Sequence, residues 1–158
     1  MTVRINHMEL TFEPGSLTKN VRDQIKDFYG DTFGFEVKDV NILKQNALLM
    51  NLDEEGSQFI LCTESPKFIN SPGYDHLGLH YDTRDEVDRI LAKVKKFKDS
   101  KIQIKEYKDL HQGRATVHAF YVRYLLPIWL DVQVIEFNGV DLPAKGWTFG
   151  SKEILKSF

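Results

Sequence analysis

The sequence has one cysteine, no long apolar run and no strong excess of either charge. Because Cys62 is alone, the chain cannot form an internal disulfide, which argues against a secreted, disulfide-stapled domain. No apolar stretch approaches the length of a membrane span, and residues 1–12 lack the features of a signal peptide. The formal net charge of −2 is too small to attract nucleic acid. We therefore expect a cytoplasmic protein with no membrane or nucleic-acid partner.

What the chain does contain is an ordinary globular composition, with 42% hydrophobic and 28% charged residues among 158. We expect a single domain over residues 1–137, followed by a C-terminal tail at 138–158. The domain divides into two modules, 1–65 and 73–137, because proline and glycine punctuate the segment between them.

The first module has the order strand, helix and three strands. Its opening strand, residues 3–13, alternates in period two and places His7 on the face opposite the apolar positions. Apolar residues then recur at helical spacing over 18–33, and Gly34 is placed to end that helix. Three short strands are expected near 35–42, 47–52 and 58–63.

The second module repeats this order of elements. A strand at 75–81 precedes a helix whose start is marked by a capping box of Thr83 and Glu86. Three more strands are expected near 102–107, 116–124 and 129–137.

The two opening strands also resemble each other in sequence. Residues 6–10 and 75–79 both have a polar residue, a histidine, an apolar residue, a variable position and a leucine. This repetition predicts that His7 and His76 occupy equivalent positions in a duplicated fold. Two imidazoles on rigid strands facing one cleft suit a metal ion, and the alternative is two unrelated strand histidines.

A repeated βαβββ module with a histidine on each opening strand and an acid on the closing strand resembles the vicinal oxygen chelate superfamily. This superfamily includes glyoxalases, bleomycin-resistance proteins and extradiol dioxygenases, and the resemblance spans residues 5–137. It implies an α+β fold in which two βαβββ modules with curved mixed sheets form a metal-binding cleft. It also implies that His7, His76 and a carboxylate within 129–137 bind the metal.

The third ligand has several candidates. Ungapped alignment with the family pattern and strand parity both favour Asp131, which shares the cleft face with Gln133. Glu136 lies on the other face unless a bulge intervenes. Gln133, or no third protein ligand at all, are the remaining alternatives.

The resemblance also bears on the identity of the metal. A fourth family ligand would fall near Leu61, which cannot bind metal. Two histidines and one carboxylate with open positions favour Fe(II) as the divalent ion, with Mn(II), Zn(II) or Ni(II) as alternatives.

Two further residues match the dioxygenase members of the family, which carry a tyrosine on the penultimate strand and a histidine in the preceding loop. Tyr121 and His111 stand at similar places and are the candidate catalytic residues. The resemblance thus implies a ring-cleaving dioxygenase acting on a catechol-like small molecule. The alternatives are a glyoxalase-like lyase or isomerase, a thiol transferase, or a metal-free drug-binding protein of the bleomycin-resistance kind.

The turn at 124–129 is unusually apolar for a hairpin tip. We expect it to be covered either by the tail, through Trp147 and Phe149, or by a second subunit. Relatives with two modules per chain commonly dimerise, so the resemblance favours a homodimer.

Overall fold

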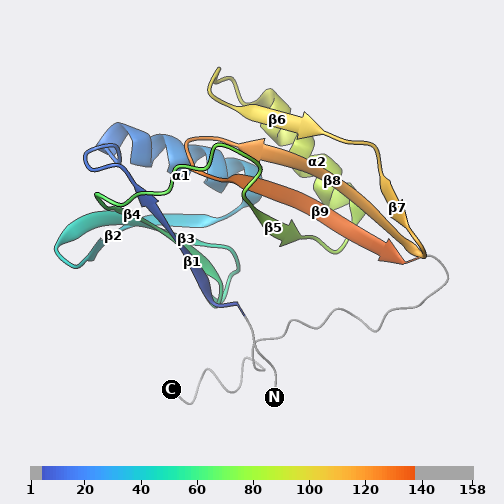
Figure 1. Ribbon diagram of the computed structural model, residues 1–158, viewed down its shortest axis with the longest axis horizontal. Helices are drawn as coiled ribbons and strands as arrows, with labels where there is room; N and C mark the ends of the chain where they lie inside the picture. Colours follow the sequence, from blue (N-terminus) through green and yellow to red (C-terminus); the bar gives the residue numbers. More distant parts are fainter. Residues whose placement is uncertain (1–4, 138–158) are drawn as a thin grey trace, which may run out of the picture.

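The computed structural model describes residues 5–137, and these form two modules with one sheet each (Figure 1). The predicted α+β class with two curved mixed sheets is confirmed. The tail at 138–158 lies outside the described residues. The first module contains β1 (His7–Phe12), α1 (Lys19–Phe33), β2 (Glu36–Ile42), β3 (Gln45–Asn51) and β4 (Phe59–Glu64). The second contains β5 (His76–His80), α2 (Arg84–Lys96), β6 (Gln103–Glu106), β7 (Leu110–Gln112), β8 (Ala115–Arg123) and β9 (Trp129–Phe137).

In both sheets the first strand of the module pairs in parallel with the last strand. Sheet A has the order β1-β4-β3-β2 and sheet B the order β5-β9-β8-β6, with the additional strand β7 paired to β8. His7 lies opposite Phe59 in the first parallel pair, and His76 lies opposite Trp129 in the second. The two histidine strands therefore occupy equivalent edge positions, as the sequence repeat predicted.

The helix ends follow from local chemistry. The Thr18 side chain caps α1 by accepting from a backbone N–H of its first turn, and Gly34 ends the helix with a φ of 77°. Thr83 and Glu86 form both halves of the predicted capping box at the start of α2. Neither helix of the described chain combines the length and the apolar character that crossing a membrane requires.

One apolar core joins the two modules. Figure 1 shows α1 over sheet A and α2 behind sheet B, and the two helices contact each other. The Phe28 ring of α1 lies 5.1 Å from Phe97 and 4.6 Å from Tyr124, measured between ring centroids. The Tyr29 hydroxyl donates to the Tyr124 carbonyl at 2.9 Å. Aromatic contacts of this kind bind module one to module two.

The apolar turn is part of this core, whereas Trp147 and Phe149, which were expected to cover it, lie outside the described residues. Tyr124, Leu126 and Ile128 are 1%, 4% and 3% exposed and belong to the core cluster that both helices join. The unusual composition of the turn is therefore explained by its burial in the chain's own core, and it gives no argument for a subunit contact.

A charged cluster ties the start of α2 to the far end of sheet B. The Arg84 guanidinium donates to Glu136 at 2.6 Å and to Asp109 at 2.8 Å. The His118 ring lies between Asp109, at 2.8 Å, and Asp88, at 2.9 Å. Burial lowers the pKa of His118, but the hydrogen bonds to the two carboxylates outweigh it and raise the pKa overall.

This cluster predicts a pH-dependent contribution to stability. A histidine whose pKa is raised on folding stabilises fully below its unfolded pKa of 6.5, and the effect disappears as pH rises through the folded value. His118→Gln should therefore cost about 1 kcal/mol in free energy of unfolding at pH 5.5 and less at pH 9. Urea unfolding at both pH values measures this. His111→Gln is the control and should show no such difference, because the His111 ring hydrogen-bonds a threonine hydroxyl and forms no ion pair with a carboxylate among the described residues.

Candidate metal and substrate site

The open face of sheet B, away from α2, carries the candidate site. Directly opposed residues on neighbouring strands share a face, and Asp131 on β9 lies opposite Tyr121 on β8. His76 on the edge strand β5 joins them, with its ring 5.2 Å from that of Tyr121. The alternate residues of β9 form the buried face, namely Leu130, Val132 and Val134.

Asp131 is a buried carboxylate that lacks a full set of partners. Its exposed fraction is 6%, and Oδ1 has no hydrogen-bond partner among the described residues. The other oxygen, Oδ2, lies 3.9 Å from Nε2 of His76. Burial raises the pKa of Asp131, and Tyr121 and His76 offset part of this effect. An unsatisfied buried polar group lowers the free energy of unfolding by about 1–3 kcal/mol, so we expect this oxygen to bind a ligand.

Both candidate histidines have their Nδ1 atoms fixed by oxygen acceptors. Nδ1 of His76 lies 2.7 Å from the Tyr74 carbonyl, which can only accept, so the proton is on Nδ1. Nδ1 of His7 lies 2.8 Å from Oδ1 of Asn6, whose amide is oriented by donating to the Ser57 carbonyl. Each histidine therefore presents the lone pair of Nε2, the arrangement that outer hydrogen bonds give to metal-binding histidines.

The structure brings two of the three predicted ligands together and does not bring His7 to them. Within residues 5–137, no three His, Cys, Asp or Glu side chains are close enough to hold one metal ion. His7 is exposed on the edge strand β1, stacked on Phe59 with ring centroids 4.9 Å apart. Leu61, the apolar residue at the predicted fourth position, lies opposite Glu9 on the same sheet.

The other candidates for the third ligand differ in where they lie. Pairing between β8 and β9 is continuous without a bulge, so Glu136 faces α2, where it binds Arg84. Gln133 lies on the open face and packs close to β5, since a Cβ atom at Gly78 would be 3.1 Å from Nε2 of Gln133. Asp131 is therefore the acid of β9 that lies beside His76 of β5.

The two predicted catalytic residues are on opposite faces of sheet B. His111 on β7 lies opposite Thr116, and its Nδ1 is 3.1 Å from the hydroxyl of that residue. The side chains of Thr116 and of its neighbour Val117 point to opposite faces of the sheet, and Val117 shares the face of Tyr121. Tyr121 thus belongs to the candidate site, whereas His111 does not reach it within this chain.

A pocket of about 550 Å³ lies over the open face of sheet B. Asp131, Tyr121 and Gln133 line it, together with Tyr74 and Tyr107. The two additional tyrosines were missed from the sequence. They lie in segments adjoining β5 and β6, just outside the strands whose alternation can be followed.

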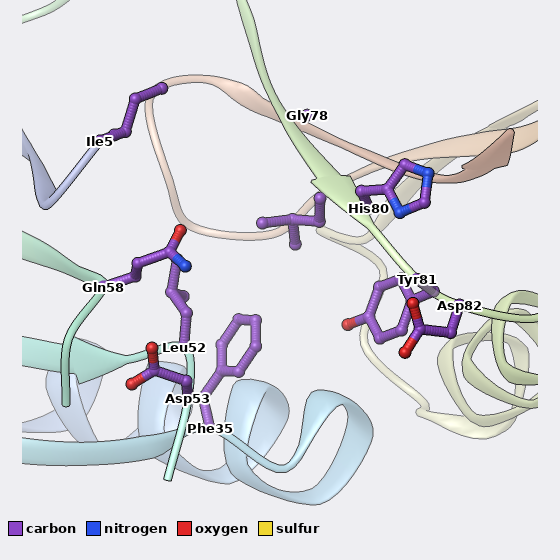
Figure 2. A pocket seen from close by; sticks show the side chains of 10 residues that line it. Ile5, Phe35, Leu52, Asp53, Gln58, Gly78, His80, Tyr81 and Asp82 are labelled. Atoms are coloured by element: carbon purple, nitrogen blue, oxygen red, sulfur yellow. The ribbon is translucent and has the colours of Figure 1, made fainter. Parts of the chain in front are cut away.

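A second pocket of about 490 Å³ lies between the two modules (Figure 2). Phe35, Leu52 and Gln58 of the first module line it, as do Leu79 and Tyr81 of the second. Asp131 is not among its lining residues but lines the pocket over sheet B, so we place the candidate site over sheet B.

Comparison with known proteins bears on the family. Residues 4–116 match the family model described as the Glyoxalase/Bleomycin resistance protein/Dioxygenase superfamily, whereas no curated protein matches the sequence. The fosfomycin resistance protein FosX from Listeria monocytogenes has a similar structure, with a TM-score of 0.57 and 13% identity over 85% of this chain and 94% of that one. A mutant of that protein complexed with Mn(II) and 1S,2S-dihydroxypropylphosphonic acid gives a TM-score of 0.55 and 12% identity over 84% and 92%.

Virulence protein STM3117 from Salmonella typhimurium also has a similar structure. Its TM-score is 0.53 and its identity is 20%, over 85% of this chain and 98% of that one. At such identities the solved structures show a shared fold, while the family model covers most of the sequence. The chain belongs to the Glyoxalase/Bleomycin resistance protein/Dioxygenase superfamily, as the repeat of its histidine strands predicted.

Proposed function

We propose that this chain is a metal-dependent enzyme that acts on a small molecule bearing two adjacent oxygens. His76 and Asp131 would supply two protein ligands, and His7 of a second copy would supply the third. The observation that carries the proposal is the buried Asp131 Oδ1, which lacks a partner among the described residues, on a carboxylate beside the Nε2 lone pair of His76.

The donor set fits a divalent metal. Two imidazoles and one carboxylate with open positions suit Fe(II) or Mn(II), and Zn(II) or Ni(II) bind similar ligands. Such an ion would polarise the substrate oxygens and lower their pKa. The solved mutant with Mn(II) and a 1,2-dihydroxy compound supports a ligand with adjacent oxygens, through the shared fold alone.

The need for a second copy follows from the position of His7. Its Nε2 lone pair is presented from an exposed side chain, and the described chain forms no three-residue metal group. Both β1 and β5 are at the edges of their sheets, and an edge strand can pair with a strand of another chain. A homodimer in which His7 of one copy approaches His76 and Asp131 of the other satisfies both features.

Ring cleavage of a catechol-like substrate is the first reaction to test. The support for it is Tyr121, which borders the pocket beside His76 and Asp131 and can hydrogen-bond a substrate oxygen. The position of His111 gives no support to its predicted role. Oxygen uptake by the Fe(II)-loaded protein with a catechol panel tests this reaction.

The second candidate is addition of water or a thiol to an epoxide, with a glyoxalase-like isomerase reaction as a related possibility. The shared fold with the fosfomycin resistance protein FosX favours the addition reaction. Loss of fosfomycin in the presence of Mn(II), with water or a thiol as the second reactant, tests it by phosphorus NMR. A protein that binds no divalent ion under any condition would contradict the enzyme proposal and favour metal-free drug sequestration.

With whichever substrate turns over, Tyr121→Phe should reduce the rate by about 10²–10⁴-fold while the metal stays bound. The reason is that Tyr121 lines the pocket, whereas His76 and Asp131 are the proposed metal ligands of this chain. Steady-state kinetics and metal content measure the two effects. Tyr81→Phe, in the pocket between the modules, is the control. Equal turnover by Tyr121→Phe and the control would rule out a catalytic role for this hydroxyl.

A further inference from the structure

Lys105 is held in a fixed position between two aromatic rings at the border of the candidate site. Its Nζ lies 3.7 Å from the ring centroid of Tyr74 and 4.5 Å from that of Trp129. The two rings are nearly parallel, with centroids 6.5 Å apart and an interplanar angle of 20°. An ammonium group enclosed in this way gains cation–π stabilisation and loses much of its rotamer freedom.

The register of sheet B aligns this lysine with the candidate site. Lys105 on β6 lies opposite Tyr121 on β8, which lies opposite Asp131 on β9. The three side chains therefore share the open face in a single row across the sheet. Because neighbouring strands are about 4.8 Å apart, Lys105 and Asp131 are separated by about 10 Å at the backbone.

The positive charge at this position has no carboxylate partner. Among residues 5–137, no acidic side chain forms an ion pair with Lys105 or with Arg123, whose guanidinium lies 4.9 Å from the Trp129 ring. Arg123 donates instead to the neutral amide of Gln103 at 2.9 Å. Two cations that are positioned on an open face and are not neutralised favour an anion there.

We propose that Lys105, assisted by Arg123, binds the anionic group of the substrate, a carboxylate, phosphate or phosphonate held beside the Trp129 ring on the strand that carries Asp131. This inference rests on the proposed function, since it assigns the substrate's other end. The substrate class is then a small molecule with two adjacent oxygens at one end and an oxyanion at the other. Tyr121 lies between the two ends in this row, and the Tyr107 ring packs 5.6 Å from it.

The rigid lysine explains why such a site would be selective. A lysine already fixed by Tyr74 and Trp129 loses little further entropy when it binds an anion, which favours affinity for a small ligand. A neutral catechol of similar size would gain nothing from it.

Binding of benzoate, phenylphosphonate and inorganic phosphate to the full-length chain tests the subsite. The sequence has two tryptophans, so Trp147→Phe leaves Trp129 beside Lys105 as the single fluorescent reporter. In this background we expect saturable quenching by at least one of the three anions. Lys105→Met should weaken that binding by about 10–100-fold, as loss of a charged hydrogen bond predicts, and Lys105→Arg should restore most of it. The exposed Lys101→Met is the matched control and should bind like the parent.

The three probes distinguish the kinds of anion, since preference for benzoate indicates a carboxylate substrate and preference for phenylphosphonate indicates a phosphonate or phosphate ester. Absence of saturable binding, or equal affinity in Lys105→Met and Lys101→Met, would overturn the inference. Mn(II) content measured on the same samples separates this result from the metal proposal. If the protein binds metal but its anion affinity does not depend on Lys105, only the subsite is contradicted. If anion binding depends on Lys105 but no metal binds, only the enzyme proposal is contradicted.

Discussion

Replacing Asp131 with asparagine is expected to reduce Mn(II) affinity by at least about 100-fold, since even outer-shell partners of metal ligands contribute 10–100-fold. The substitution preserves the volume of a side chain that is 6% exposed, so it should leave the core intact. The metal-free variant should also be no less stable than the parent, because the change removes a buried carboxylate with an unpartnered oxygen. Electron paramagnetic resonance of added Mn(II) and urea unfolding measure the two quantities.

Glu136→Gln is the matched control for this substitution. Glu136 lies on the same strand, but it faces α2 and binds Arg84 at 2.6 Å, so its loss should affect stability and leave metal binding unchanged. If Glu136→Gln loses metal and Asp131→Asn retains it, the face assigned to the metal site is wrong.

The fold was largely predictable from the sequence because its local signals agree with one another. The period-two alternation of residues 3–13, the capping box at Thr83 and the glycine at 34 each specify one element or boundary. Strand β7 was missed because its residues are all exposed and show no alternation. The apolar turn at 124–129 was recognised as covered, but apolar composition alone does not identify which part of the molecule covers it.

The site was predictable as far as strand parity extends. Parity along β8 and β9 gives the common face of Tyr121 and Asp131, because their pairing is unbroken. A sequence repeat gives equivalence, not proximity, so it could not establish where His7 lies relative to His76. The side of His111 depends on the pairing of a three-residue strand, which no periodicity reveals. Strand parity could have placed Lys105 on the same face as Tyr121, which it lies opposite. It was not singled out because a lysine on a strand is usually solvated.

Mixing two defective variants, His7→Ala and His76→Ala, is expected to restore metal binding that neither has alone. In a shared-site dimer, one site of each mixed dimer contains both substitutions and the other contains neither. Random reassortment makes about half of the dimers mixed, so about a quarter of the parental sites should reappear. Mn(II) content and turnover, measured after refolding the variants together, test this, with light scattering to establish the dimer.

The choice of partner variant distinguishes a site shared between two copies from a site formed within one chain. His7→Ala mixed with Asp131→Asn should also restore about a quarter of the sites, because these residues would come from different copies. His76→Ala mixed with Asp131→Asn should restore none, because the structure holds both residues in the same chain, 3.9 Å apart, and every site then carries one defect. Restoration by all three mixtures would indicate an effect unrelated to the ligand set. A site formed within one chain predicts restoration by none, and in that case His7 must reach His76 and Asp131 by a rearrangement of the two modules.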